Sequence, residues 1–184
     1  MAADQAANLF DWGHGMTEQE RYKKVMAQFP TGVVVVSVAD GQGSITGLTA
    51  SSFTSVSLNP ALVLFCTAYD TDSFPHLQRE PRFAINVLAE DQTDLAWQFA
   101  GSEPDKGHAA PHLIRASGTP VLTGAVAVIE CEKHVVHPGG DHAIVVGRVV
   151  AFDLDQNLRP LLYWRGNLSG FQTPSAGSDG DTAR

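Results

Sequence analysis

The feature that most constrains the fold of this chain is a succession of short apolar, β-branched segments separated by turn residues. The clearest is the run Val33–Val38, which leads into the turn sequence Asp40-Gly41-Gln42-Gly43. Segments of strand character lie at 33–38, 44–51, 56–58, 62–67, 83–88, 125–137, 142–154 and 161–164. The helical patterns between them are short, and strands and helices do not alternate regularly. This pattern favours a mainly β fold, an antiparallel barrel with short peripheral α-helices, over a doubly wound parallel sheet.

Short helices are expected at the periphery. The first begins with the capping box Thr17–Glu20, in which a hydroxyl and a glutamate satisfy each other's backbone amides. Its apolar side chains recur at helical spacing up to Pro30, which ends it, so it should pack against an apolar surface. A second helix is expected from 71 or 72, and Asp91 is expected to cap another that ends near Phe99.

The chain is expected to form one domain with a flexible segment at each end. A length of 184 residues fits a single core. Residues 1–16 are expected to be a flexible N-terminal arm, and the polar, Gly/Ser-rich residues 173–184 a disordered tail, which leaves 17–172 as the folded domain. Within it, Gly101–Thr119 shows no clear pattern, and a loop of that length is usually functional.

Charge and composition exclude several classes of protein. The net charge of −8 leaves no basic face for nucleic acid. No apolar run approaches the ~20 residues of a membrane span, and the N-terminus lacks the basic and apolar regions of a secretory signal. Cys66 and Cys131 lie in separate apolar runs with no C-x-x-C motif, which indicates buried thiols in the reducing cytoplasm.

Several familiar nucleotide and catalytic motifs are absent from the sequence. There is no G-x-G-x-x-G between a strand and a helix, no Walker A sequence, no H-E-x-x-H and no G-x-S-x-G elbow. Gly41, Gly43 and Gly47 lie in a hairpin at the wrong spacing. A nucleotide would therefore be bound without a Rossmann unit.

The segment Gly47–Leu58 is rich in hydroxyls. If it is a strand, Thr49 and Ser51 share one face, and Ala50 and Ser52 share the other. Hydroxyls and free backbone amides at a strand end can bind a phosphate or the edge of a planar ring. Taken alone, the composition favours a solvated edge strand.

Imidazoles and a carboxylate gather around a Pro-Gly-Gly turn at His134, His137, Asp141 and His142. Such a group could hold a metal ion. However, His134 and His137 are three apart, which places them on opposite faces of a strand. The favoured alternative is a turn that presents His142 to a binding site, with no metal.

Two further segments carry candidate binding groups. Tyr163 and Trp164 could stack on a planar ring, and Arg165 could meet a phosphate. Lys106 lies in the long loop with two histidines and could contact an anion. In isolation, each is more simply explained as a core strand or a solvated loop.

Taken together and in this order, these segments resemble the flavin reductase-like domain family, the NAD(P)H:flavin oxidoreductases that supply two-component monooxygenases. The Gly-Asp-His turn and the hydroxyl-rich strand are the most specific elements. The matching stretches are Phe29–Val33, Gly47–Phe53 leading into Ser55–Pro60, Phe83–Leu88 with Asp91–Gln92, Gly118–Leu122, Gly140–His142 with Gly147–Val149, and Pro160–Tyr163. They span nearly all of the expected domain.

The resemblance implies a split β-barrel of Greek-key, FMN-binding type that works as a homodimer, with a flavin laid across the barrel. The cofactor would be FMN, with FAD as the alternative, and NADH or NADPH would donate electrons. By the same resemblance, the cofactor-binding residues are Thr31, Thr49, Ala50, Ser51, Ser52, Cys66, Thr67, Phe83, Asn86 and Lys106. The nicotinamide would meet Asp141, His142 and Tyr163, and His142 would be the catalytic residue.

The implied activity is reduction of a flavin nucleotide that is then released to a separate monooxygenase. Because the cofactor carries the redox chemistry, no catalytic triad is needed, and His142 would orient the nicotinamide. The alternatives are a flavin-binding electron carrier or sensor without reductase activity, a related split-barrel oxidase or deazaflavin-dependent reductase, and a metal-dependent enzyme. A non-enzymatic interaction protein is the least favoured, because it would leave the polar segments without a purpose. The sequence departs from the family at Gly107, where an aromatic residue often follows the basic one, and after Gly166, where the family often has an aromatic residue.

Overall fold

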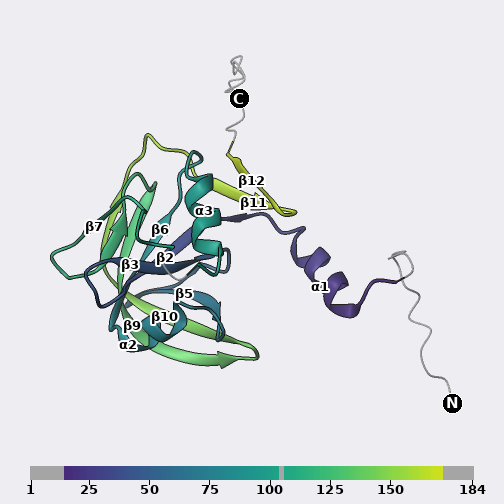
Figure 1. The fold of residues 1–184 in the computed structure, drawn as a ribbon, viewed down its shortest axis with the longest axis horizontal. Coiled ribbons are helices and arrows are strands. Elements are labelled where there is room, and N and C mark those ends of the chain that lie inside the picture. Colours follow the sequence, from purple (N-terminus) through teal and green to yellow (C-terminus); the bar gives the residue numbers. More distant parts are fainter. Residues whose placement is uncertain (1–14, 104–105, 172–184) are drawn as a thin grey trace, which may run out of the picture.

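The computed structural model describes residues 15–103 and 106–171, and this part of the chain is mainly β (Figure 1). The predicted arm, 1–16, lies almost wholly outside the described residues, and the predicted tail, 173–184, lies entirely outside them, so the domain limits stay predictions. A seven-stranded sheet has the order β3-β2-β6-β9-β10-β5-β4, a three-stranded sheet the order β1-β11-β12, and β7 pairs with β8. All pairings are antiparallel.

Each predicted segment matches a helix or a strand, whereas the short strands at 31–32, 112–114, 120–122 and 167–170 were not predicted. In chain order the elements are α1 (Glu18–Met26), β1 (Thr31–Gly32), β2 (Val34–Ala39), β3 (Ile45–Ala50), β4 (Thr54–Leu58), β5 (Ala61–Ala68), α2 (Phe74–Arg79), β6 (Arg82–Val87), α3 (Thr93–Ala100), β7 (His112–Ile114), β8 (Pro120–Leu122), β9 (Ala127–Gly139), β10 (His142–Leu154), β11 (Leu161–Trp164) and β12 (Asn167–Gly170).

Strand β2 is buried on both faces, which explains why it is rich in valine. Val34, Val36 and Val38 enter one apolar cluster together with residues of β3, β5 and α2. Val35 enters a second cluster, which includes Phe99 of α3. Strand β2 therefore lies between two apolar clusters and contributes side chains to both.

The seven-stranded sheet curls but does not close by hydrogen bonds. Leu48 of β3 and Phe65 of β5, from strands near opposite ends of the sheet order, pack in the same cluster. Within the described residues, β3 and the edge strand β4 are not paired with each other. The predicted mainly β fold is confirmed, whereas the structure shows a curled open sheet in place of a closed barrel.

The N-terminal helix is formed as predicted but does not pack as predicted. Thr17 accepts from the Glu20 amide at 3.2 Å, and its own amide donates to Glu20 Oε2 at 2.8 Å, which confirms the capping box. The helix ends at Met26, before Pro30, and none of its residues is buried. It projects away from the sheet (Figure 1). Its apolar face therefore has no partner within the described chain.

Two other local predictions are corrected. Gln92, rather than Asp91, occupies the N-cap of α3 and makes no side-chain capping bond there. Its side chain instead accepts from the Ala89 amide and donates to the Thr123 carbonyl, so it joins two loops. The stretch Gly101–Thr119 is not wholly irregular, because it contains β7. No helix in the described ranges is both long and apolar enough to cross a membrane.

Candidate functional site

Three adjoining pockets lie beside the hydroxyl-rich strand β3. The Lys106 pocket, of about 300 Å³, is lined by Leu48, Thr49, Cys66, Thr67, Ala68, Asp70, Thr71, Asp72, Phe99, Ala100, Gly101, Ser102, Lys106 and His142. The Tyr163 pocket, of about 200 Å³, is lined by Val33, Thr49, Ala50, Ser51, Ala96, Trp97, Ala100, Tyr163 and Leu168. The α1 pocket, of about 840 Å³, includes Thr31, Ser51, Ser52, Phe53 and Tyr163 with residues of α1. The Lys106 and Tyr163 pockets share Thr49 and Ala100 in their walls, and the Tyr163 and α1 pockets share Ser51 and Tyr163.

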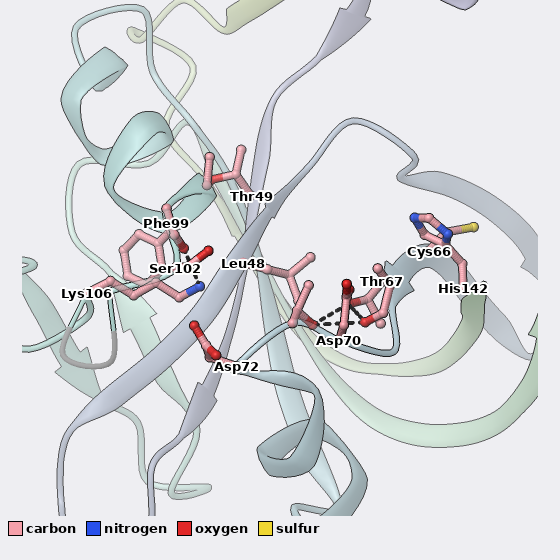
Figure 2. A pocket seen from close by; sticks show the side chains of 14 residues that line it. Leu48, Thr49, Cys66, Thr67, Asp70, Asp72, Phe99, Ser102, Lys106 and His142 are labelled. Carbon is pink, nitrogen blue, oxygen red and sulfur yellow. Dashed lines mark hydrogen bonds between the residues drawn. The ribbon is translucent and has the colours of Figure 1, made fainter. Parts of the chain in front are cut away.

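The Lys106 pocket gathers side chains from distant parts of the chain (Figure 2). The end of β5 supplies Cys66 and Thr67, and the start of β10 supplies His142 beside them, because His142 pairs with Ala68 in the sheet. The C-terminal end of α3 supplies Phe99. The result is a pocket with an imidazole at one end and the Lys106 ammonium at the other.

Lys106 is the buried charge of this pocket, with 6% of its surface exposed. Its Nζ donates to the carbonyl of Gly101 at 2.9 Å, and no second acceptor is found for it among the described residues. An ammonium group has three N–H donors. Burial lowers the pKa of Lys106, and the charge of Asp72 partly opposes that shift. A buried cation with spare donors fits an anionic group such as a phosphate.

Gly107 explains one departure from the family pattern. A Cβ at this position would collide with the backbone carbonyl oxygen of Ile45 in β3. The chain therefore passes β3 closely at this point, and no larger residue fits without moving the backbone. This approach holds Lys106 against the pocket.

His142 stands at the opposite end, and its Nδ1 lies 2.6 Å from Asp141 Oδ1. Asp141 itself is 93% exposed and does not line the pocket. The hydrogen bond from His142 lowers the pKa of the Asp141 carboxyl, so that group is ionised at neutral pH. With Nδ1 engaged, Nε2 is the nitrogen left for a ligand.

Hydroxyl groups in the pocket wall are mostly engaged with the protein. Thr49 Oγ1 donates to the Ala96 carbonyl of α3 at 2.6 Å, and Thr67 Oγ1 lies 3.1 Å from Thr71 Oγ1. Thr49 thus joins β3 to α3 and forms the wall between the Lys106 and Tyr163 pockets. The threonines shape the cavity as much as they offer hydrogen bonds to a ligand.

The remaining hydroxyl-rich residues line the other two pockets. Ala50 borders the Tyr163 pocket, Ser51 borders both, and Ser52 borders the α1 pocket. Ser52 Oγ also accepts from the Cys66 amide at 2.9 Å, which ties this turn to β5. Thr31 pairs with Tyr163 across β1 and β11, and its buried Oγ1 has no partner among the described residues.

Phe83 and Asn86, predicted to close the flavin pocket, lie in the interior instead. Phe83 is 1% exposed and packs edge-on against Phe65, with ring centroids 5.4 Å apart. Asn86 is fully buried; its amide donates to the Val35 carbonyl and Ser37 Oγ, and its oxygen accepts from the Leu122 amide. Neither residue lines any of the three pockets. Their place in the matching segment reflects core packing.

The structure also adds lining residues that the sequence did not single out. Asp70 and Asp72 follow β5 and border the Lys106 pocket, and Trp97 of α3 borders the Tyr163 pocket together with Tyr163. The only sequence signal was their position, after a strand end and on a short helix. Trp97 gives the Tyr163 pocket a second aromatic ring, where the family's aromatic residue after Gly166 is absent.

The imidazoles weighed as metal ligands are not assembled into a site. His137 pairs with Ile144, whereas His134 lies at the register shift between Val135 and Lys133. Across residues 15–103 and 106–171, no group of three or more His, Cys, Asp or Glu side chains is placed to hold a metal ion.

Known proteins share the sequence pattern of most of this chain. The model of the flavin reductase-like domain matches residues 26–172, which covers all the strands and every pocket wall except part of α1. The chain belongs to the flavin reductase-like domain family. Within this domain, Thr49 of β3 and His142 of the Gly-Asp-His turn line the same pocket, and their roles in binding stay predictions.

Relatives of this flavin reductase-like chain are named for the same chemistry. A flavin reductase of Pseudomonas putida is 37% identical over 150 residues, covering 82% of this chain and 88% of the relative. The reductase subunit of a flavin-dependent monooxygenase from Rhodococcus jostii is 37% identical over 155 residues, covering 84% of this chain and 79% of the relative.

A solved structure shares the fold. The NADH:FAD oxidoreductase of Streptomyces globisporus superposes with a TM-score of 0.80 at 35% identity, covering 85% of this chain and 95% of that one. The same protein has been solved in complex with NAD and FAD fragments.

Proposed function

We propose that this protein is an NAD(P)H:flavin oxidoreductase that reduces a flavin nucleotide and releases it to a separate monooxygenase. The observation that carries this proposal is the Lys106 pocket, which has a buried ammonium group at one end and an exposed imidazole at the other. These two groups suit the two ends of the reaction, a phosphate anchor and a carboxamide contact. The relatives named as flavin reductase and as a monooxygenase reductase subunit support it.

Lys106 and the walls around it would hold the flavin nucleotide. The ammonium would bind a phosphate oxygen through its spare donors. Cys66 and Thr67 would border the ring, and backbone amides of the Ala50–Ser52 turn would donate to the ring edge on which negative charge develops. The bound flavin supplies the redox chemistry by accepting a hydride. FMN is the nucleotide predicted from the sequence, and FAD is named for a relative.

His142 would orient the nicotinamide. Its Nδ1 is engaged by Asp141, so Nε2 is the nitrogen available to the carboxamide of NADH or NADPH. Tyr163 and Trp97 would shelter a ring of the dinucleotide in the Tyr163 pocket. No side chain need accept or donate a proton in the hydride step, which is consistent with the lack of a nucleophile–base pair in the sequence.

The assembly and setting are part of the same proposal. We propose a homodimer, because α1 leaves an apolar face exposed beside the α1 pocket. The curled sheet would correspond to the split β-barrel of Greek-key topology, with its gap between β3 and β4. Two free cysteines suit the cytoplasm, where thiols stay reduced.

Steady-state oxidation of NADH and of NADPH, with FMN, FAD and riboflavin each supplied in turn, tests the function. Saturable turnover with at least one nucleotide flavin is the expected result. Flavin binding without turnover would instead favour an electron carrier or sensor. Absence of any saturable flavin association would contradict the proposal as a whole.

A further inference from the structure

The Lys106 pocket has more negative charge than positive. Its charged lining groups are Lys106, Asp70 and Asp72, so with His142 neutral the carboxylates are in excess. Both aspartates are exposed, and neither appears in an ion pair of the described structure. The whole chain has a net charge of −8, which adds to the repulsion of anions. A pocket for an anionic flavin is thus built with only one buried cation.

The position of Asp72 decides which part of a ligand feels this charge. Figure 2 shows Asp72 facing Lys106 at one end of the pocket, with Asp70 nearer the middle and His142 and Cys66 at the far end. The two side chains are close enough for Asp72 to influence the ionisation of Lys106. A phosphate that reaches Lys106 must therefore also approach the carboxylate of Asp72.

The two flavin nucleotides differ in the charge of that phosphate. A terminal phosphomonoester, as in FMN, has a second pKa near 6 and carries about 1.5–2 negative charges at pH 7. The phosphate nearest the flavin in FAD is part of a pyrophosphate and carries one charge, while its second charge lies further along the molecule. Repulsion from a fixed carboxylate is therefore stronger for FMN.

We propose that Asp72 is a specificity-determining residue, which disfavours the dianionic phosphate of FMN beside Lys106 and makes FAD the preferred flavin. The inference rests on the proposed function, since it concerns the phosphate end of the same pocket. Between unit charges ~8 Å apart, at an effective dielectric constant of ~60–80 suited to an exposed group, repulsion changes Kd about threefold per charge. The carboxylate of Asp72 should therefore raise the Kd of FAD about threefold and that of FMN by about the square of this factor.

The test compares three flavins on matched variants. Kd values of FAD, FMN and riboflavin are measured by equilibrium dialysis at pH 7.5 and fixed ionic strength. The proteins are the wild type, Asp72→Asn and the control Asp91→Asn. Asp91 is also exposed but lies before α3, whose eight residues separate it from the Gly101 end of the pocket. Riboflavin has no phosphate and reports any change in the ring site.

In the wild type, FAD should bind more tightly than FMN. Asp72→Asn should lower the Kd of FMN about tenfold and that of FAD about threefold, and leave riboflavin within about twofold, by the charge argument above. Asp91→Asn should leave all three unchanged. Equal shifts for FMN and FAD, or a wild type that prefers FMN, would overturn the inference while leaving the reductase intact. A wild type that binds none of the three flavins would overturn the proposed function, and with it this assignment.

Discussion

Only one of the two ring nitrogens of His142 makes a hydrogen bond to the described part of the protein. Nδ1 is 2.6 Å from Asp141 Oδ1, and the side chain is 46% exposed at the pocket mouth. His142→Ala should raise the KM for NADH about tenfold, which corresponds to the ~1–1.5 kcal/mol of one lost hydrogen bond. The Kd for flavin should change by less than about twofold by the same reasoning, since the flavin does not depend on that bond.

Steady-state kinetics and flavin titration of the same preparation separate the two effects. His137→Ala is the matched control, because His137 is an exposed imidazole on the neighbouring strand that lines none of the three pockets. An unchanged KM for NADH in His142→Ala would refute the orienting role.

The two cysteines differ in environment and should differ in reactivity. Cys131 is fully buried, and burial, assisted by the charge of Glu130, raises the pKa of its thiol to about 12. Cys66 is half-buried and lines the Lys106 pocket. A thiol reagent at pH 8 should therefore modify one cysteine per native chain, and bound flavin should slow that reaction.

The titration of Cys131 has a definite sign. Its folded pKa lies above the unfolded value of 9.0, so the stabilisation from keeping the thiol neutral is complete below pH 9. It is lost progressively as the pH rises from 9 through about 12.

In the labelling experiment, Cys66→Ser should abolish modification of the native protein, and denaturant should expose the thiol of Cys131. Two rapidly labelled thiols in the native protein would contradict this assignment.

At the scale of elements, we expect Asn86 of β6 to stabilise the fold and not to bind the cofactor. Asn86 is its only buried polar side chain and makes hydrogen bonds to β2 and to the backbone of β8. Asn86→Ala should lower the free energy of unfolding by about 2–4 kcal/mol, because buried partners are left unsatisfied. Urea denaturation measures the loss. Unaltered stability accompanied by a large rise in flavin Kd would restore Asn86 to the cofactor site.

The strands themselves were predictable because burial dictates their composition. β2 is rich in valine since both of its faces are buried, and β9 and β10 are long strands joined by a turn at Gly140, whose φ of +75° suits that turn. The three residues of β7 carry no such pattern, since their pairing to β8 is a tertiary event. The N-cap of α3 was mispredicted because Gln92 serves two loops instead of the helix.

The site was predictable in part, for a related reason. The hydroxyls of β3 and the turn at His142 have recognisable local sequences, and Thr49 and His142 line the same pocket. Phe83 and Asn86 lie in an equally recognisable segment whose role is packing, which a motif alone does not distinguish. Asp72 carries no motif at all, and its relation to Lys106 arises only when the segments that follow β5 and α3 line the same pocket.

At the scale of the whole molecule, α1 is the helix that packs least against the described chain, since none of its residues is buried. Its capping box is intact, yet Tyr22, Val25, Met26 and Phe29 are 50–69% exposed. The segment after the helix is held to β11 through Gln28, whose carbonyl accepts from Trp164 Nε1 at 3.2 Å. A helix held only near its C-terminal end, with its apolar face open, is what a subunit interface would leave in a single chain.

The predicted homodimer can be tested on this face. Tyr22 and Met26 are one helical turn apart and both line the α1 pocket. The double variant Tyr22→Ser, Met26→Ser should shift the mass measured by light scattering from two chains to one, because about 800 Å² per subunit must be buried for a stable dimer. Lys24→Ser, an exposed polar position on the same helix, should leave the mass unchanged. A wild type with the mass of one chain, 19.6 kDa, at micromolar concentration would contradict the predicted homodimer.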